Sequence, residues 1–268
     1  MIKYKNILAK GFCVGSSMLI PGVSGGSMAM ILGIYDQLIL AVSDFFADTK
    51  KNALFLAIFC LGSVIGIVLF AKPLLFLLNK FPMPVTYFFL GAVCGGIPMI
   101  LKKAQIKKIN KDSLIYPLLG FLLVIALTML PENIFTVDMG NKLWSFFILT
   151  LGGMIVAWAL VFPGISVSYM LLIMGIYDYT IKAINTWQWS YLLPMFLGGV
   201  IGTFITAKLL GKALVKYPTP TFLLILGFIL GSIPDIFPGI PLGGNIVFCI
   251  LTFISGAIII YKLSVFDK

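Results

Sequence analysis

One sixteen-residue segment occurs twice in the chain and restricts its fold more than any other feature. Residues 21–36 read PGVSGGSMAMILGIYD and residues 163–178 read PGISVSYMLLIMGIYD, with nine of the sixteen positions identical. Both copies lie inside long apolar runs. A Pro-Gly break there leaves backbone groups that lipid cannot hydrogen-bond, so other protein or a wet cavity must surround it. Apolar segments interrupted by Gly and Pro at matching places in two halves of a chain indicate the central site of a transporter.

Composition assigns the chain to the polytopic membrane proteins of the all-α class. Of its 268 residues, 60% are hydrophobic and 10% are charged, and the mean hydropathy is +1.11. All 19 basic residues are lysines scattered between apolar runs, so no nucleic-acid partner is expected. Without His or Arg, the chain lacks the commonest metal ligand and the bidentate phosphate clamp. The four cysteines lie in apolar runs without C-x-x-C spacing, and we predict neither a metal nor a cofactor.

The duplication extends well beyond the sixteen-residue motif. Residues 61–98 align with 197–234 without a gap, and 17 of the 38 positions are identical. We therefore predict one integral membrane domain over 1–268, built from a first repeat at 1–130 and a second at 143–262.

Each repeat is predicted to contain one broken hairpin and three membrane spans. The hairpins have apolar arms at 7–20 with 27–42, and at 143–162 with 166–182; the first pair is too short for two crossings, which indicates a re-entrant hairpin. The spans are expected at 53–79, 85–101, 113–130, 190–215, 219–234 and 245–262. Each repeat then crosses the membrane an odd number of times, so the second repeat is inverted relative to the first.

The distribution of lysines indicates the orientation. If the N-terminus is cytoplasmic, fourteen lysines lie on the cytoplasmic side against Lys80, Lys142 and Lys182 outside. This bias follows the positive-inside rule. We predict that both termini are cytoplasmic and that the two Pro-Gly tips approach each other near the middle of the bilayer.

The hairpin tips are candidate anion sites. The arms that follow them begin as helix N-termini, which carry a partial positive charge and unpaired N–H donors. Glycines allow a ligand to approach the backbone, and serines add hydroxyl donors. The predicted binding residues are Pro21, Gly22, Ser24, Gly25, Gly26, Ser27, Pro163, Gly164, Ser166 and Ser168. The alternative is that these small residues serve close helix packing.

Two lysines within spans occupy matching positions in the repeats. Lys72 is expected near the outer interface and Lys208 near the inner one. Each could capture an anionic head group, or could extend its ammonium group to the interface with no further role.

The motif closes with Tyr35-Asp36 and Tyr177-Asp178. On a continuous helix the aspartates lie roughly 18 Å beyond the tips, toward opposite interfaces. They are candidate gating or ion-coupling residues, or alternatively anchors of the hairpins, and the tyrosines are candidate interface aromatics.

Together these residues resemble the bacterial polyprenyl-phosphate transporter (PopT) family. The resemblance rests on IPGVSGGS with LGIYD at residues 20–36, on its echo at 162–178 and on the chain length, and it covers essentially the whole chain. It implies transport of undecaprenyl phosphate across the bacterial cytoplasmic membrane, which returns this lipid carrier to the inner leaflet for cell-envelope synthesis. The resemblance implies a functional role for the motif residues from Pro21 to Ser27, apart from Val23. It implies the same for Gly33, Tyr35 and Asp36. The second copy departs at Val167, Ser168 and Tyr169.

Other functions fit the residues less well. An undecaprenyl-pyrophosphate phosphatase shares a Pro-Gly-x-Ser motif but continues it with Arg-Ser and uses paired glutamates, whereas here Gly25 stands at the Arg position and Glu132 is the only glutamate. Without a cationic clamp or a base, phosphoryl transfer is poorly provided for. A transporter of a small soluble anion stays an alternative, because hairpin tips bind carboxylate or phosphate equally well. A membrane scaffold leaves two costly backbone breaks unexplained. The sequence leaves open the coupling ion and a homo-oligomeric state.

Overall fold

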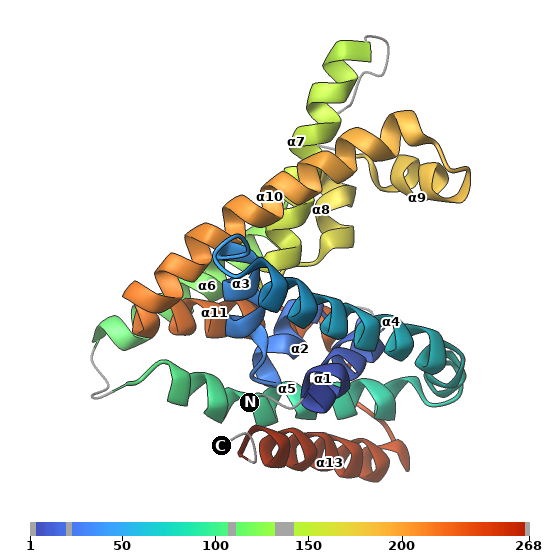
Figure 1. The fold of residues 1–268 in the computed structure, drawn as a ribbon. Coiled ribbons are helices and arrows are strands. Elements are labelled where there is room, and N and C mark those ends of the chain that lie inside the picture. Colours follow the sequence, from blue (N-terminus) through green and yellow to red (C-terminus); the bar gives the residue numbers. More distant parts are fainter. Residues whose placement is uncertain (1–3, 20–22, 107–110, 132–141, 266–268) are drawn as a thin grey trace.

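The computed structural model describes residues 4–19, 23–106, 111–131 and 142–265, and this part of the chain is helical without β-strands (Figure 1). The first repeat supplies α1 (Tyr4–Ser17), α2 (Gly25–Ile31), α3 (Tyr35–Ser43), α4 (Thr49–Lys80), α5 (Pro82–Lys103) and α6 (Lys111–Thr128). The second supplies α7 (Lys142–Val161), α8 (Val167–Ile173), α9 (Tyr177–Asn185), α10 (Trp189–Lys216), α11 (Pro218–Gly231), α12 (Ile233–Ile236) and α13 (Asn245–Val265).

The helices have the length and composition of membrane spans. Six of them, counting α11 with α12 as one, are long and apolar enough to cross a bilayer, and the number rises to eight if each of two bent helix pairs is one span. Helix α6 is also apolar but is shorter than these spans. Large apolar side chains are exposed along most of these helices, as expected where lipid is the solvent. The chain is a multi-pass membrane protein, and the predicted spans at 53–79 and 85–101 correspond to α4 and α5.

Glycines join the long helices in equivalent pairs. Helix α1 packs on α4, and α7 packs on α10. A Cβ atom built on Gly62 lies 2.3 Å from the backbone oxygen of Leu8, and one built on Gly198 lies 1.8 Å from that of Thr150. Gly62 and Gly198 are aligned positions of the two repeats. Small residues therefore let these backbones approach closely, as is common between helices in membranes.

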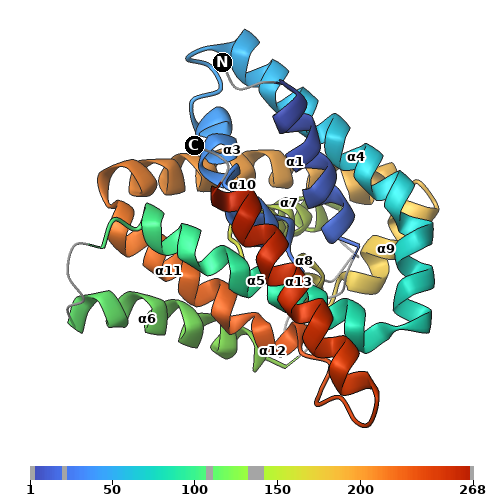
Figure 2. The ribbon, with the colours of Figure 1, turned by 90° about the horizontal axis from the view of Figure 1, so that it is seen from below.

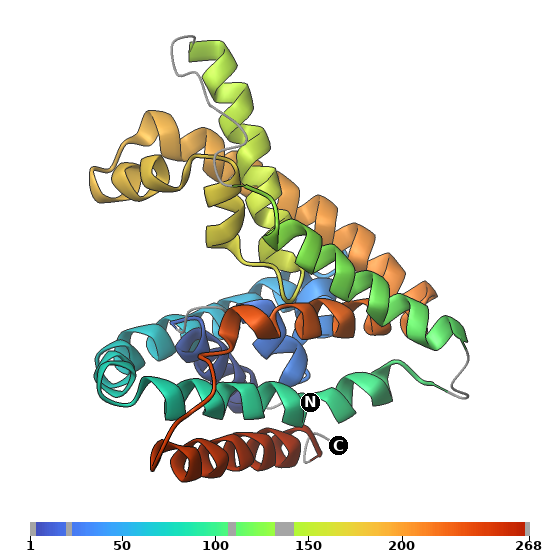
Figure 3. The same cartoon turned by 180° about the vertical axis from the view of Figure 1, so that it is seen from behind.

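The last helix of each repeat packs on the other repeat. Helix α13 lies along α5, and α6 lies along α11 (Figures 2 and 3). The aligned residues Gly91 and Gly227 again make the close contacts, to the backbones of Phe253 and Pro117. Equivalent helix pairs thus form twice. Because α6 packs on the second repeat and α13 packs on the first, the two repeats form one packed unit.

The helical segment that follows each Pro-Gly motif is broken, which corrects the expectation of one continuous helix over 27–42 and over 166–182. The chain bends by 115° between α2 and α3, and by the same angle between α8 and α9. Gly33, with φ of 70°, and Gly175, with φ of 67°, end the first helix of each pair. In each case the amide of the glycine and that of the next residue bond back to the preceding turn, Gly33 to Met30 and Ile34 to Ala29 in the first copy. The estimate of 18 Å along a straight helix to the aspartates is therefore wrong.

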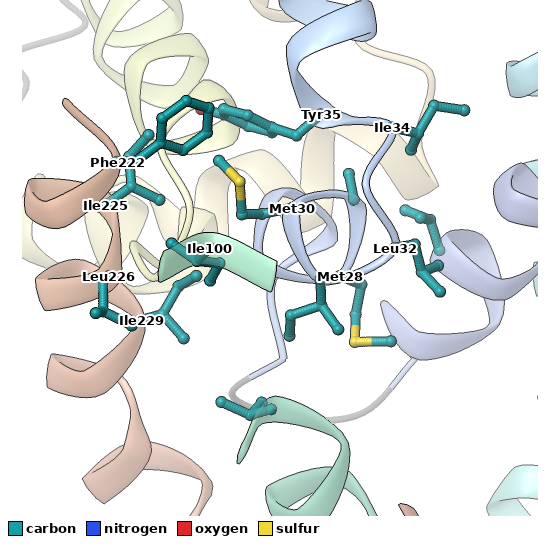
Figure 4. Close-up of a cluster of buried hydrophobic side chains, with 14 of the residues drawn as sticks. Met28, Met30, Leu32, Ile34, Tyr35, Ile100, Phe222, Ile225, Leu226 and Ile229 are labelled. Carbon is teal, nitrogen blue, oxygen red and sulfur yellow. The ribbon is translucent and has the colours of Figure 1, made fainter. Parts of the chain in front are cut away.

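Helix α2 lies in the centre of the protein. Its Met30 and Ile31 are fully buried and pack among apolar residues of α5 and α11, including Ile100 and Ile225 (Figure 4). Because α2 is surrounded by protein on these sides, its buried face has no access to lipid. The core therefore holds one of the two duplicated motifs in a fixed position.

Candidate functional site

The first motif starts helix α2 with a serine cap. Ser24 has an extended backbone, and its hydroxyl oxygen accepts a hydrogen bond of 3.0 Å from the amide of Ser27. The two hydroxyls also bond to each other at 2.8 Å, and Ser27 is buried. Of the predicted residues before this cap, Pro21 and Gly22 lie outside the described residues.

The second motif starts helix α8 in the same way. Ser166 has an extended backbone, and its hydroxyl oxygen accepts a bond of 3.3 Å from the amide of Tyr169. Gly164 has a φ of 84°, and a Cβ atom there would lie 2.3 Å from the carbonyl oxygen of Phe228. Glycine is therefore required at this turn by both conformation and space.

The two motifs are in direct contact. The amide of Gly164 donates a hydrogen bond of 3.2 Å to the hydroxyl oxygen of Ser24, which joins residues 140 positions apart. A Cβ atom on Gly26 would lie 3.3 Å from the Cα atom of Pro163, which is buried. Ser24 thus caps its own helix and holds the turn before the other one.

A partly polar cavity of about 440 Å³ lies where the two motifs meet. Six of the predicted site residues line it, namely Ser24, Gly25, Gly164, Ser166, Ser168 and Tyr177. Within the part of the chain that the structure describes, the amides of Val167 and Ser168 have no hydrogen-bond acceptor, as is usual in the first turn of a helix. The cavity therefore offers N–H and hydroxyl donors, the groups that bind an anion.

The cavity also contains polar residues that the sequence analysis did not select. Ser232 and Asp235, at the junction of α11 and α12, line it. In the first repeat the aligned residues are Gly96 and Met99, which are not polar side chains. Comparison of the repeats therefore does not single out Ser232 and Asp235. The available signal was the polar SIPD sequence at the end of an apolar run. Asp235 is the one charged residue among those that line the described cavity.

Tyr35 and Asp36 do not line this cavity, and both bond to residues of other helices. The hydroxyl of Tyr35 donates a hydrogen bond of 2.6 Å to the carbonyl oxygen of Val161, at the end of α7. Asp36 forms an ion pair with Lys103 of α5. The Lys103 ammonium group also lies 5.9 Å from the centre of the Phe222 ring of α11. These contacts connect the first motif to both repeats.

The remaining predicted residues lie outside the cavity. Asp178 is exposed at the start of α9. Lys72 of α4 and Lys208 of α10 are exposed on their helices and do not line the cavity. Nowhere in the described ranges do three His, Cys, Asp or Glu side chains gather as metal ligands.

Comparison with known proteins identifies the family. A family model described as VCA0040-like, undecaprenyl phosphate translocase-like, matches residues 14–242, which include both motifs and the cavity. The chain belongs to this family. No solved structure matches the chain.

Two curated relatives of the family carry a functional name. The polyprenyl-phosphate transporter of Vibrio cholerae is 30% identical over 251 residues, which are 88% of this chain and 79% of the relative. The polyprenyl-phosphate transporter of Staphylococcus aureus is 32% identical over 249 residues, which are 89% and 88% of the two chains. Membership of a family of transporters agrees with the prediction that the chain is a transporter and not an enzyme.

Proposed function

We propose that this protein moves undecaprenyl phosphate across the bacterial cytoplasmic membrane, and that the phosphate binds in the cavity between the two motifs. The observation that carries the proposal is the contact between Ser24 and Gly164, which places two helix starts and their donors around one cavity. The names of the two relatives support a polyprenyl phosphate as the substrate. Transport to the inner leaflet would recycle the lipid carrier for cell-envelope synthesis.

The pairing of equivalent helices supports two repeats of opposite orientation, each with a re-entrant hairpin and with both termini in the cytoplasm. In this orientation Lys103 is cytoplasmic and Asp235 faces the outer side. The Asp36–Lys103 ion pair then closes the cytoplasmic side, while the cavity with Asp235 opens outward. In this proposal, a protein in the conformation described above would accept its substrate from the outer leaflet.

The two tyrosines of the motif suggest how the other state forms. Tyr35 bonds the carbonyl oxygen of Val161, and the residues that occupy the equivalent positions of the duplicated motif are Tyr177 and Leu19. Both of these line the open cavity, and the Tyr177 hydroxyl has no hydrogen-bond partner among the described residues. In the alternate state, Tyr177 would donate to the Leu19 carbonyl while Tyr35 releases Val161. Lys72 and Lys208 would attract the head group at the two interfaces.

The test is transport of labelled undecaprenyl phosphate between the leaflets of vesicles that contain the purified protein. Ser168 is exposed in the cavity and caps no helix, so Ser168→Asp adds a negative charge without removing a structural contact. We expect the wild type to move the lipid and Ser168→Asp to be inactive, because like charges repel in a site of low dielectric constant. Ser168→Ala removes only the hydroxyl donor and separates that loss from the effect of the added charge, so it should lower transport much less than Ser168→Asp does.

Two results would contradict the proposal. One is the absence of transport by folded wild-type protein. The other is full inhibition by free inorganic phosphate with no inhibition by a short-chain polyprenyl phosphate, which would indicate a transporter of a small soluble anion.

A further inference from the structure

An apolar groove lies next to the cavity, near the end of helix α7. Its volume is about 410 Å³, within the range of roughly 300–1,000 Å³ that ligand pockets commonly have. Helix α3 with the turn after it and helix α4 form one wall, and helices α7 and α10 form the other. The groove thus lies between the two repeats. The lining residues used below are Val42, Phe45, Leu160, Gly199, Val200, Thr203 and Phe204.

The groove and the cavity share a residue. Leu160, near the end of α7, lines both of them, and the sequence continues from it to Pro163 and Gly164 at the break. A ligand with its charged end at Ser24 and Gly164 therefore has an apolar surface directly beside that end. A polyprenyl phosphate has this composition, because its phosphate is attached to the first isoprenoid unit.

The walls of the groove suit a branched, unsaturated hydrocarbon. Phe45 and Phe204 meet edge to face, with ring centres 6.2 Å apart, and Val42 and Val200 add branched aliphatic surface. Thr203 is the one hydroxyl residue among the groove's described lining, and its oxygen donates a bond of 2.7 Å to the carbonyl oxygen of Gly199 within the helix. The groove therefore offers apolar contacts and no free donor to a polar ligand.

We propose that this groove binds the isoprenoid units next to the phosphate, so that the protein recognises the chain of its substrate as well as the head group. The proposal rests on the proposed function. In this proposal, the first isoprenoid units leave the bulk lipid and contact the protein. Because the groove is formed by both repeats, the bound chain would lie where the repeats move relative to each other.

Gly199 provides a direct test, because the groove can be filled from this position. A Cβ atom there meets a single neighbouring atom, the carbonyl oxygen of Gly153 at 3.9 Å, so a side chain can be added without a backbone clash. Gly199→Trp places an indole in the groove. The matched control is Ile201→Trp, two residues further along α10, which is exposed and does not line the groove.

The probe is a polyprenyl phosphate that carries a photoreactive diazirine on the isoprenoid unit nearest the phosphate, reconstituted with the full-length protein. We expect crosslinks to peptides of α3, α7 and α10. Gly199→Trp should lower this crosslinking and the rate of lipid transport by about tenfold, since it removes the apolar contact area of the chain. Ile201→Trp should leave both unchanged. A second variant, Val200→Asn, adds a polar group with little bulk and should weaken crosslinking in the same direction.

Several results would overturn the inference. Wild-type crosslinking and transport in folded Gly199→Trp and Val200→Asn would do so, as would crosslinks confined to other helices. Equal labelling of the groove by a diazirine phospholipid, without competition from undecaprenyl phosphate, would indicate a site for bulk lipid. If the groove variants are normal and Ser168→Asp is inactive, the tail site is wrong and the head-group site stands. If the wild type transports no lipid, the proposed function itself fails.

Discussion

The hydroxyl of Tyr35 donates a hydrogen bond of 2.6 Å to the carbonyl oxygen of Val161, 126 residues further along the chain. The bond links the end of the first motif to the end of the helix that precedes the second motif. Its counterpart would join Tyr177 to Leu19, and in this structure both of those residues line an open cavity. Two copies of one motif therefore make different contacts in one structure, which is what a protein that alternates between two states requires.

Tyr35→Phe should destabilise the protein, and Tyr177→Phe should not. The first change leaves the buried carbonyl of Val161 without its donor, at a cost of about 1–3 kcal/mol. The second removes a hydroxyl that faces the cavity. Thermal unfolding of the detergent-purified variants compares the two directly. Equal melting temperatures for Tyr35→Phe and the wild type would contradict the role given to this bond.

Substitution of Ser24 should be more damaging than substitution of Ser166. Both serines cap a short helix, and loss of a cap costs about 0.5–2 kcal/mol. Ser24 also accepts the hydrogen bond from the amide of Gly164, so Ser24→Ala additionally removes this bond between the two motifs. We expect Ser24→Ala to lower both thermal stability and transport more than Ser166→Ala does. Ser24→Thr keeps the oxygen and should restore most of the loss; failure of this rescue would assign the effect to space and not to the hydrogen bond.

The Asp36–Lys103 pair should show measurable coupling. The two side chains are 32% and 20% exposed, so solvent screens the pair only in part, and a coupling energy of about 0.5–1 kcal/mol is expected. A double-mutant cycle with Asp36→Asn and Lys103→Met, measured by chemical unfolding, gives this value. The exchanged pair Asp36→Lys with Lys103→Asp should recover part of the loss. Strictly additive effects of the two single substitutions would mean that the contact contributes nothing.

The sequence was sufficient to predict an all-helical chain with several apolar spans, because hydropathy leaves a pattern in the chain itself. The two inverted repeats and the head-group residues stay predictions. The sequence was not sufficient to predict contacts that occur in only one of the two repeats. Lys103 pairs with Asp36, but Gly239 stands at the position that continues the alignment in the second repeat, so Asp178 has no equivalent lysine. Asp235 was missed for the same reason, since its counterpart is Met99.

The bends at Gly33 and Gly175 had a signal that the sequence analysis did not use. A glycine that follows an apolar helical run is a common helix end, because it adopts the left-handed conformation without strain. The apolar runs at 27–42 and 166–182 continue past these glycines, and for this reason each run was interpreted as a single helix. No sequence pattern predicts that α6 packs on the second repeat and α13 on the first. This packing depends on which glycine-containing helix faces meet in three dimensions.

Gly33→Ala and Gly175→Ala should each destabilise the protein by about 1–2 kcal/mol, because alanine is strained at a positive φ. Gly199→Ala makes a useful comparison. Gly199 is helical and has room for a methyl group, so alanine there should raise stability by about 0.5–1 kcal/mol. Thermal unfolding of the three variants gives the order of stabilities. A neutral Gly33→Ala would mean that the bend between α2 and α3 is not held at this angle in the membrane.

Removal of the Asp235 carboxylate charge should strengthen binding of the substrate phosphate. Asp235 lines the cavity that we assign to the head group, and no lysine is among the described residues around that cavity. An ionised carboxylate repels a phosphate, so Asp235→Asn should lower the concentration of polyprenyl phosphate needed for half-maximal transport by about three- to tenfold. Vesicle transport measured over a range of lipid concentrations tests this, with Asp44→Asn, at an exposed position outside the cavity, as the control. A different result, in which Asp235→Asn transports more slowly and no longer responds to an imposed proton or sodium gradient, would contradict simple repulsion and would identify Asp235 as the group that carries the coupling ion.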